Sequence, residues 1–235
     1  MPGGFETSFQ GRNVVVTGGA GALGQAVVDA FARAGAIVHV PVRGNLPAAS
    51  DARARYTAGV DLTDEAAVVG FYAGLPSELW ASVHLAGGFA MAGIAETTLG
   101  DLRAQLDINL VSAFLCCREA VRRFRSRPGG GGGRIVNVAS RAAVRPEGGK
   151  AAYTLAKAAV VALTLELAEE LKTEAILVNA VAPGTIDTPA NRSAMAGLDP
   201  SHFVSPAEIA DVIVWLASPA NRIASGTVVP VYGRS

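Results

Sequence analysis

The chain has 235 residues, of which half are apolar and 17% are charged, and its 20 basic and 20 acidic residues cancel to a formal net charge of zero. This composition excludes an intrinsically disordered chain, and the lack of a basic surplus argues against a nucleic-acid partner. The sequence shows no signal-peptide core and no run of 18 apolar residues, so we expect a cytoplasmic protein without a membrane span.

Strand and helix patterns alternate along the chain. Short apolar or β-branched runs predict strands at 13–18, 36–42, 56–62, 81–88, 175–184 and 227–233, and a glycine-rich turn leads into a further strand within 128–140. Helical periodicity marks 22–35, 64–75, 99–126, 151–171 and 206–217, whereas 189–205 is expected to be irregular. The alternation predicts an α/β fold, a single doubly wound domain over 1–235 with a parallel sheet and helices on both faces.

A glycine-rich turn joins the first predicted strand to the first predicted helix. The stretch "TGGAGALG" holds the pattern G-x-G-x-x-G at Gly19, Gly21 and Gly24. Glycine lets the backbone approach a pyrophosphate closely, and the helix N-terminus offers free N–H groups and a positive dipole end. Gln25 follows Gly24 where a P-loop would need Lys and Ser or Thr, so the pattern indicates a dinucleotide site.

Tyr153 and Lys157 stand four residues apart on the predicted helix 151–171, so they share one face. Ser140 ends a predicted strand at the edge where α/β proteins bind ligands. A nearby ammonium lowers the pKa of a phenol, and a phenol tuned in this way exchanges protons near neutral pH. The three residues therefore predict acid–base chemistry on an alcohol or carbonyl oxygen, with Ser140 holding that oxygen.

Together these motifs resemble the short-chain dehydrogenase/reductase family over nearly the whole chain, from "GRNVVVTGGAGALG" to "SGTVVPVYG". The family's Ser and Tyr-x-x-x-Lys set matches Ser140, Tyr153 and Lys157, and its tetrad asparagine matches Asn109 in "LDINLVSAF". The resemblance implies a Rossmann fold and an NAD(P)-dependent oxidoreductase that moves a hydride between nicotinamide and a small carbonyl or secondary alcohol. It also implies that Lys157 holds the nicotinamide ribose and that Asn109 anchors a water in the proton relay.

The same resemblance implies the residues that hold the cofactor. The nucleotide motif, a segment beside adenine, a glycine turn after the fourth strand and a segment that caps the nicotinamide all have counterparts. These residues are Gly18, Gly19, Gly21, Ala22, Leu23, Gly24; Asp61, Leu62; Ala86, Gly87; and Pro183, Gly184, Ile186, Thr188.

Three departures from the family pattern leave the substrate open. The family's N-N-A-G reads "HLAG" from His84, its V-D-G-G reads "VYGR", and the substrate-covering segment 189–205 is short. A 3-oxoacyl thioester reductase and a pteridine reductase therefore remain alternatives, as does a dinucleotide-binding sensor without turnover. His39, His84 and His202 lack metal-ligand spacing and the adjacent Cys116 and Cys117 make no metal or disulfide framework, so we expect no metal.

Cofactor choice depends on the end of the second strand, where an acidic residue binds the ribose 2′-OH of NAD and an arginine accommodates the 2′-phosphate of NADP. Val42 occupies the acidic position and Arg43 follows it, which predicts that NADP is preferred and that NAD remains possible. The helix at 151–171 is apolar nearly all round, so its outer side needs a cover. Because the family pairs such helices between subunits, we expect a homotetramer or a homodimer.

Overall fold

The fold is built on a seven-stranded parallel sheet with the order β3-β2-β1-β4-β5-β6-β7. The computed structural model describes residues 8–46, 52–127 and 132–233. The strands are β1 (Asn13–Thr17), β2 (Ile37–Pro41), β3 (Ala54–Thr57), β4 (Leu79–His84), β5 (Gly133–Val138), β6 (Ile176–Pro183) and β7 (Val228–Val231). The chain builds outward from β1 to β3 and then resumes on the other side of β1 with β4. This reversal leaves a crevice at the carboxyl ends of β1 and β4, where such sheets bind ligands.

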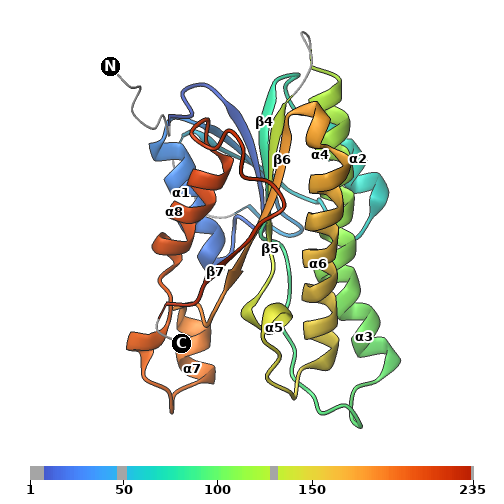
Figure 1. Ribbon diagram of the computed structural model, residues 1–235, viewed down its shortest axis with the longest axis vertical. Helices are drawn as coiled ribbons and strands as arrows, with labels where there is room; N and C mark the ends of the chain where they lie inside the picture. The colour runs from blue at the N-terminus through green and yellow to red at the C-terminus, as the bar shows by residue number, and fades with distance from the viewer. Residues whose placement is uncertain (1–7, 47–51, 128–131, 234–235) are drawn as a thin grey trace.

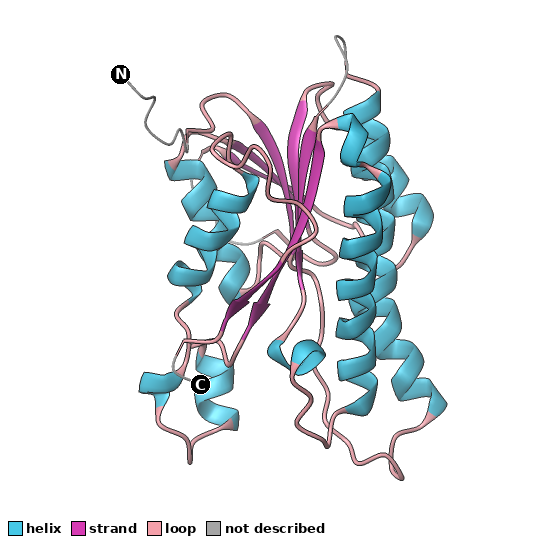
Figure 2. Ribbon diagram, viewed as in Figure 1, coloured by secondary structure: helices cyan, strands magenta, loops and turns pink. Residues whose placement is uncertain are grey.

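Helices cover both faces of the sheet, as Figures 1 and 2 show. One face carries α1 (Ala22–Arg33) and α8 (Pro206–Ala217), and the other carries α2 (Glu65–Ala73), α4 (Ser112–Arg125) and α6 (Ala151–Glu170). Each layer seals an apolar core, with Phe31 and Ile213 buried on the first face and Phe71 and Phe124 on the second. The predicted doubly wound parallel sheet is therefore confirmed.

The structure changes three of the expected elements and adds one short helix. The third strand covers Ala54–Thr57 rather than 56–62, since Gly59 takes a positive φ of 76° and turns the chain away. The expected helix 99–126 is α3 (Leu99–Leu106) and α4 joined by a π-helical turn, Asp107–Val111. A short helix, α5 (Arg141–Val144), precedes α6. The segment 189–205, expected to be irregular, holds α7 (Pro189–Ala194) and a 3-10 turn, Pro200–His202, whereas the glycines at 129–131 lie outside the described residues.

Among the described residues, α6 is the one helix with the length and mean hydropathy of a membrane span, at 1.5 over its best window. A core helix of a globular protein passes the same test, and α6 packs on β6 and α3. This packing accounts for the apolar residues on the inner side of α6. On its outer side Leu155 and Leu165 are exposed.

A chain of polar side chains crosses the core between the sheet and the α2–α4–α6 layer. The Tyr72 hydroxyl lies 2.8 Å from Ser82 Oγ, which lies 2.9 Å from His84 Nε2. His84 Nδ1 lies 2.8 Å from Asn137 Oδ1, and Asn137 Nδ2 donates to Thr164 Oγ1 at 3.0 Å. We call these five residues the buried polar chain. It joins β4, β5 and α6, the three elements that lead into the cavity described next.

Candidate cofactor and active site

A cavity of about 980 Å³ opens at the carboxyl ends of β1, β4, β5 and β6. Most of the residues predicted to bind cofactor or to act on substrate line it. From the cofactor set these are Gly18, Gly21, Ala22, Leu23, Gly24, Ala86, Gly87, Pro183, Gly184, Ile186 and Thr188. Asn109, Ser140, Tyr153 and Lys157 line the same cavity. Residues as far apart in the sequence as Gly18 and Thr188 therefore face one space.

The glycine turn after β1 leaves no room for a side chain at Gly18 or Gly24. Gly18 has a φ of +68°, and a Cβ there would lie 2.8 Å from the backbone nitrogen of Ala86. A Cβ on Gly24 would lie 2.1 Å from the carbonyl oxygen of Gly18. Helix α1 has Gly21 as its N-cap residue, with no side-chain cap, and its first turn holds no acidic residue. Free N–H groups beside a tight glycine turn fit the pyrophosphate of a dinucleotide.

Four residues of the predicted cofactor set do not line the cavity. Gly19 is buried, and a Cβ there would lie 2.6 Å from Val40 Cγ1, so this glycine packs the turn onto β2. Arg43, Asp61 and Leu62 lie in the loops after β2 and β3. The Asp61 carboxylate accepts hydrogen bonds from the backbone and hydroxyl of Thr63, which hold the pKa of Asp61 low, and the nearby Arg43 charge lowers it further.

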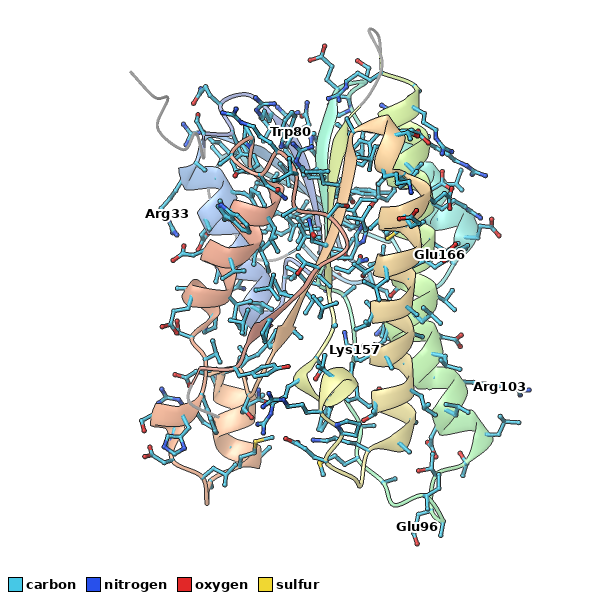
Figure 3. The ribbon with its side chains drawn as sticks, in the orientation of Figure 1. Arg33, Trp80, Glu96, Arg103, Lys157 and Glu166 are labelled. Carbon is cyan, nitrogen blue, oxygen red and sulfur yellow. The ribbon has the colours of Figure 1, made fainter. Side chains whose placement is uncertain are left out.

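Tyr153 and Lys157 project from α6, with Lys157 placed near α5 in Figure 3. Burial raises the pKa of Tyr153, and a hydrogen bond with Ser140 acts in the opposite direction. Lys157 Nζ donates to the carbonyl oxygen of Val138 at 2.9 Å, and burial lowers the pKa of Lys157 to about 8. The structure therefore adds Ser140 as a group that lowers the pKa of Tyr153, and it bonds the Lys157 ammonium, expected to act on the phenol, to the carbonyl oxygen at the end of β5.

Asn109 lies in the π-helical turn and is 1% exposed. Its Nδ2 donates to the carbonyl oxygens of Gly88 and Gln105, both at 3.0 Å, and its Oδ1 accepts from the Gly88 nitrogen at 3.2 Å. A Cβ on Gly87 would lie 2.5 Å from Asn109 Oδ1 and 3.2 Å from Lys157 Nζ. Asn109 thus ties the helix to the glycine turn after β4, and Gly87 allows the two polar groups to approach that turn.

Several cavity residues were not predicted from the sequence. The ring of Phe89 meets Tyr153 edge to face, with 4.9 Å between ring centroids. Arg141, Glu147 and Lys150 form a charged side of the cavity, and Asn191, Leu198 and His202 belong to the covering segment. Phe89 follows the glycine turn and Arg141 follows Ser140, so adjacency to a motif was the signal that could have identified these two.

Comparisons with known proteins agree with this arrangement. A family model described as short chain dehydrogenase matches residues 12–199. The 2,5-dichloro-2,5-cyclohexadiene-1,4-diol dehydrogenase of Sphingobium indicum is 33% identical, covering 97% of this chain and 98% of that protein. The cis-4-hydroxycyclohexanecarboxylate dehydrogenase of Sinomonas cyclohexanicum is 34% identical, covering 96% and 97%. The crystal structure of a dehydrogenase/reductase from Sinorhizobium meliloti 1021 has a TM-score of 0.82 at 26% identity, covering 98% of each chain.

The two named dehydrogenases match over most of the chain at identities above 30%, and the family model covers most of it, so the expected oxidoreductase function is confirmed. The chain belongs to the short-chain dehydrogenases, oxidoreductases that transfer a hydride between a nicotinamide dinucleotide and an alcohol or ketone.

Proposed function

We propose that this oxidoreductase interconverts a small secondary alcohol and its ketone, with Tyr153 as the acid–base residue and NADP as the preferred cofactor. The proposal rests on one observation: a single cavity is lined by Ser140, Tyr153 and Lys157 and by the glycine turn that precedes α1. By their names, the two relatives described above act on ring alcohols, which favours an alcohol or ketone over an acyl thioester or a pteridine.

Proton transfer falls to Tyr153. Because burial raises its pKa, the phenol keeps its proton at neutral pH and can donate it to a carbonyl oxygen in the direction of reduction. The Ser140 hydroxyl, already bonded to Tyr153, holds the same oxygen. The nicotinamide supplies or accepts the hydride when the cofactor is bound. In this proposal Lys157, whose ammonium lines the cavity beside the glycine turn after β4, would hold the nicotinamide ribose, and Asn109 keeps that turn in place through its bonds to Gly88.

Replacing the phenol tests this role. Tyr153→Phe should keep the fold and the cofactor affinity and lower kcat by about 10²–10⁴-fold, the range for loss of a positioned acid–base group. Tyr56→Phe on β3, at the far edge of the sheet, is the matched control and should turn over as the wild type does. Initial rates of NADPH oxidation with a panel of ketones measure both. A Tyr153→Phe enzyme with most of its activity would refute the mechanism.

The preference for NADP rests on the end of β2. Val42 is buried there and Arg43 is exposed beside it, so no carboxylate occupies the position that would repel a 2′-phosphate. Arg43→Ala should weaken NADPH binding and leave NADH nearly unchanged, and Val42→Asp should move the preference toward NADH. A wild-type enzyme with a higher kcat/KM for NADH than for NADPH would show that these residues do not set the choice.

We also propose that the chain works as a homodimer or homotetramer in the cytoplasm. Phe114 on α4 and Leu155 and Leu165 on α6 expose 47%, 57% and 46% of their surface, and such side chains on neighbouring helices favour pairing with a second copy. Buried free cysteines suit a reducing compartment. Light scattering at micromolar concentration should give a multiple of 23.9 kDa, and a monomer would refute the assembly.

A further inference from the structure

We propose that the α5 side of the cavity binds a carboxylate of the substrate, so that the preferred substrate is an oxo acid or hydroxy acid with an apolar body. The proposal rests on the proposed function, since it names the substrate class of that same cavity. It assigns the role to Arg141 and Lys150, which no part of the reaction chemistry above requires.

The charges on this side of the cavity do not cancel. Arg141 Nη2 lies 3.3 Å from Glu147 Oε1, and Lys150 Nζ lies 2.7 Å from Glu147 Oε2. The pKa of Glu147 is held low by its hydrogen bond to Lys150 and by the Arg141 charge, so it stays ionised at neutral pH. One carboxylate therefore serves two cations, and one positive charge remains in excess at the cavity wall.

Arg141 also keeps an unused donor. Its Nε is buried and has no hydrogen-bond partner among the described residues. A buried guanidinium donor without a partner costs free energy, and a planar guanidinium is suited to a carboxylate through two parallel hydrogen bonds. The Arg141 guanidinium lies 5.8 Å from the centroid of the Tyr232 ring, which restricts its movement. Arg141 is the first residue of α5 and follows Ser140 directly, and both residues line the cavity.

The rest of the cavity wall is suited to an apolar body. Phe89, Met195, Leu198 and Phe203 line it. Asp199 is the second acidic residue that lines the cavity. Its carboxylate accepts a hydrogen bond from the Ser201 nitrogen at 2.9 Å, so it caps the turn in which it lies. A ring or short chain could contact these apolar side chains, with its reacting oxygen at Ser140 and Tyr153 and its carboxylate at Arg141 and Lys150.

The test compares two ligands of nearly the same shape, one anionic and one neutral, neither of which carries an alcohol or ketone that could react. Cyclohexanecarboxylate and cyclohexanecarboxamide are titrated by calorimetry into the enzyme saturated with NADP⁺. We expect the acid to bind at least about tenfold more tightly than the amide, as a charge-assisted hydrogen bond would give. Arg141→Gln should reduce this ratio to about one, whereas Glu147→Gln should increase it because both cations are released.

Arg103→Gln is the matched control, since it removes the same charge from α3, where Figure 3 shows Arg103 pointing out from the molecule. Its acid-to-amide ratio should equal that of the wild type. A wild-type ratio near one, absence of binding by either ligand, or equal effects of Arg141→Gln and Arg103→Gln would each overturn the proposal. Failure of the proposed function would show differently, as no NADPH or NADH oxidation with any ketone, acidic or neutral.

Discussion

We expect acid to destabilise the protein through His84, the middle member of the buried polar chain. His84 is 3% exposed, and burial lowers its pKa from the ordinary 6.5 to about 4. The bonds of the chain run in one direction if Tyr72 donates to Ser82, Ser82 donates to His84 Nε2, and His84 Nδ1–H donates to Asn137. A proton added at Nε2 would leave the Ser82 hydroxyl without its acceptor.

The size of the effect follows from the two pKa values. Between pH 6.5 and about 4 the unfolded chain takes up a proton at His84 that the folded chain does not, so stability falls as the pH falls. The full difference corresponds to about 3 kcal/mol, a large part of the roughly 5–15 kcal/mol that holds a typical domain folded. His39, whose pKa burial also lowers to about 4, adds a loss of the same sign.

Urea unfolding near pH 7.5 and near pH 4.5 isolates the contribution of His84. His84→Asn should be less stable than the wild type at the higher pH, because it breaks the chain, but should lose about 2–3 kcal/mol less on acidification. The exposed His202 provides the control, and His202→Asn should keep the pH dependence of the wild type. If His84→Asn loses as much stability on acidification as the wild type, the buried imidazole is not the acid-sensitive group.

Three further predictions follow from close packing and burial. Gly24→Ala should lower the free energy of unfolding and abolish cofactor binding in a titration, whereas Gly21→Ala should leave the free energy of unfolding nearly unchanged, because its Cβ would lie 3.4 Å from the nearest protein atom. Cys116 and Cys117 are each 1% exposed and burial raises the pKa of Cys116 to about 12, so a thiol reagent should label them only at the rate of unfolding. Lys157→Met should end turnover yet raise the free energy of unfolding at neutral pH by about 1–3 kcal/mol, because a lysine whose pKa drops from 10.5 to about 8 destabilises the fold below pH 8.

Regular alternation made the fold predictable from the sequence. Apart from β3, whose sequence is ARYT, each strand of the parallel sheet contains a short apolar run, and most helices show a 3.6-residue period, so residue types alone located them. The glycine turn at Gly18–Gly24 and the pair Tyr153 and Lys157 were predictable for a related reason. Glycines that must approach a backbone closely and side chains one helical turn apart obey local spacing rules.

Long-range contacts decided the features that the sequence could not predict. The π-helical turn at Asp107–Val111 has no period of its own in the sequence, and Asn109 holds it to Gly88 from another element. Likewise, nothing in the sequence around His84 predicts its hydrogen bonds. They form because β4, β5 and α6 bring Ser82, Asn137 and Thr164 together around it. Partners of this kind depend on the register between strands, which a pattern within one strand does not contain.

Lys157 illustrates the limit of an argument from spacing. Four residues of separation place its ammonium on the same face as Tyr153, and the sequence argument inferred from this that the charge tunes the phenol. The lysine side chain is long, however, and it reaches the carbonyl oxygen of Val138, two residues before Ser140 on the neighbouring strand. The ammonium is therefore held by the same strand end that leads to Ser140, whose hydroxyl hydrogen-bonds the phenol. A small shift of β5 relative to α6 would move the hydroxyl and the ammonium together, which makes the packing of these two elements, joined by Asn137 and Thr164, the structural condition for an aligned site.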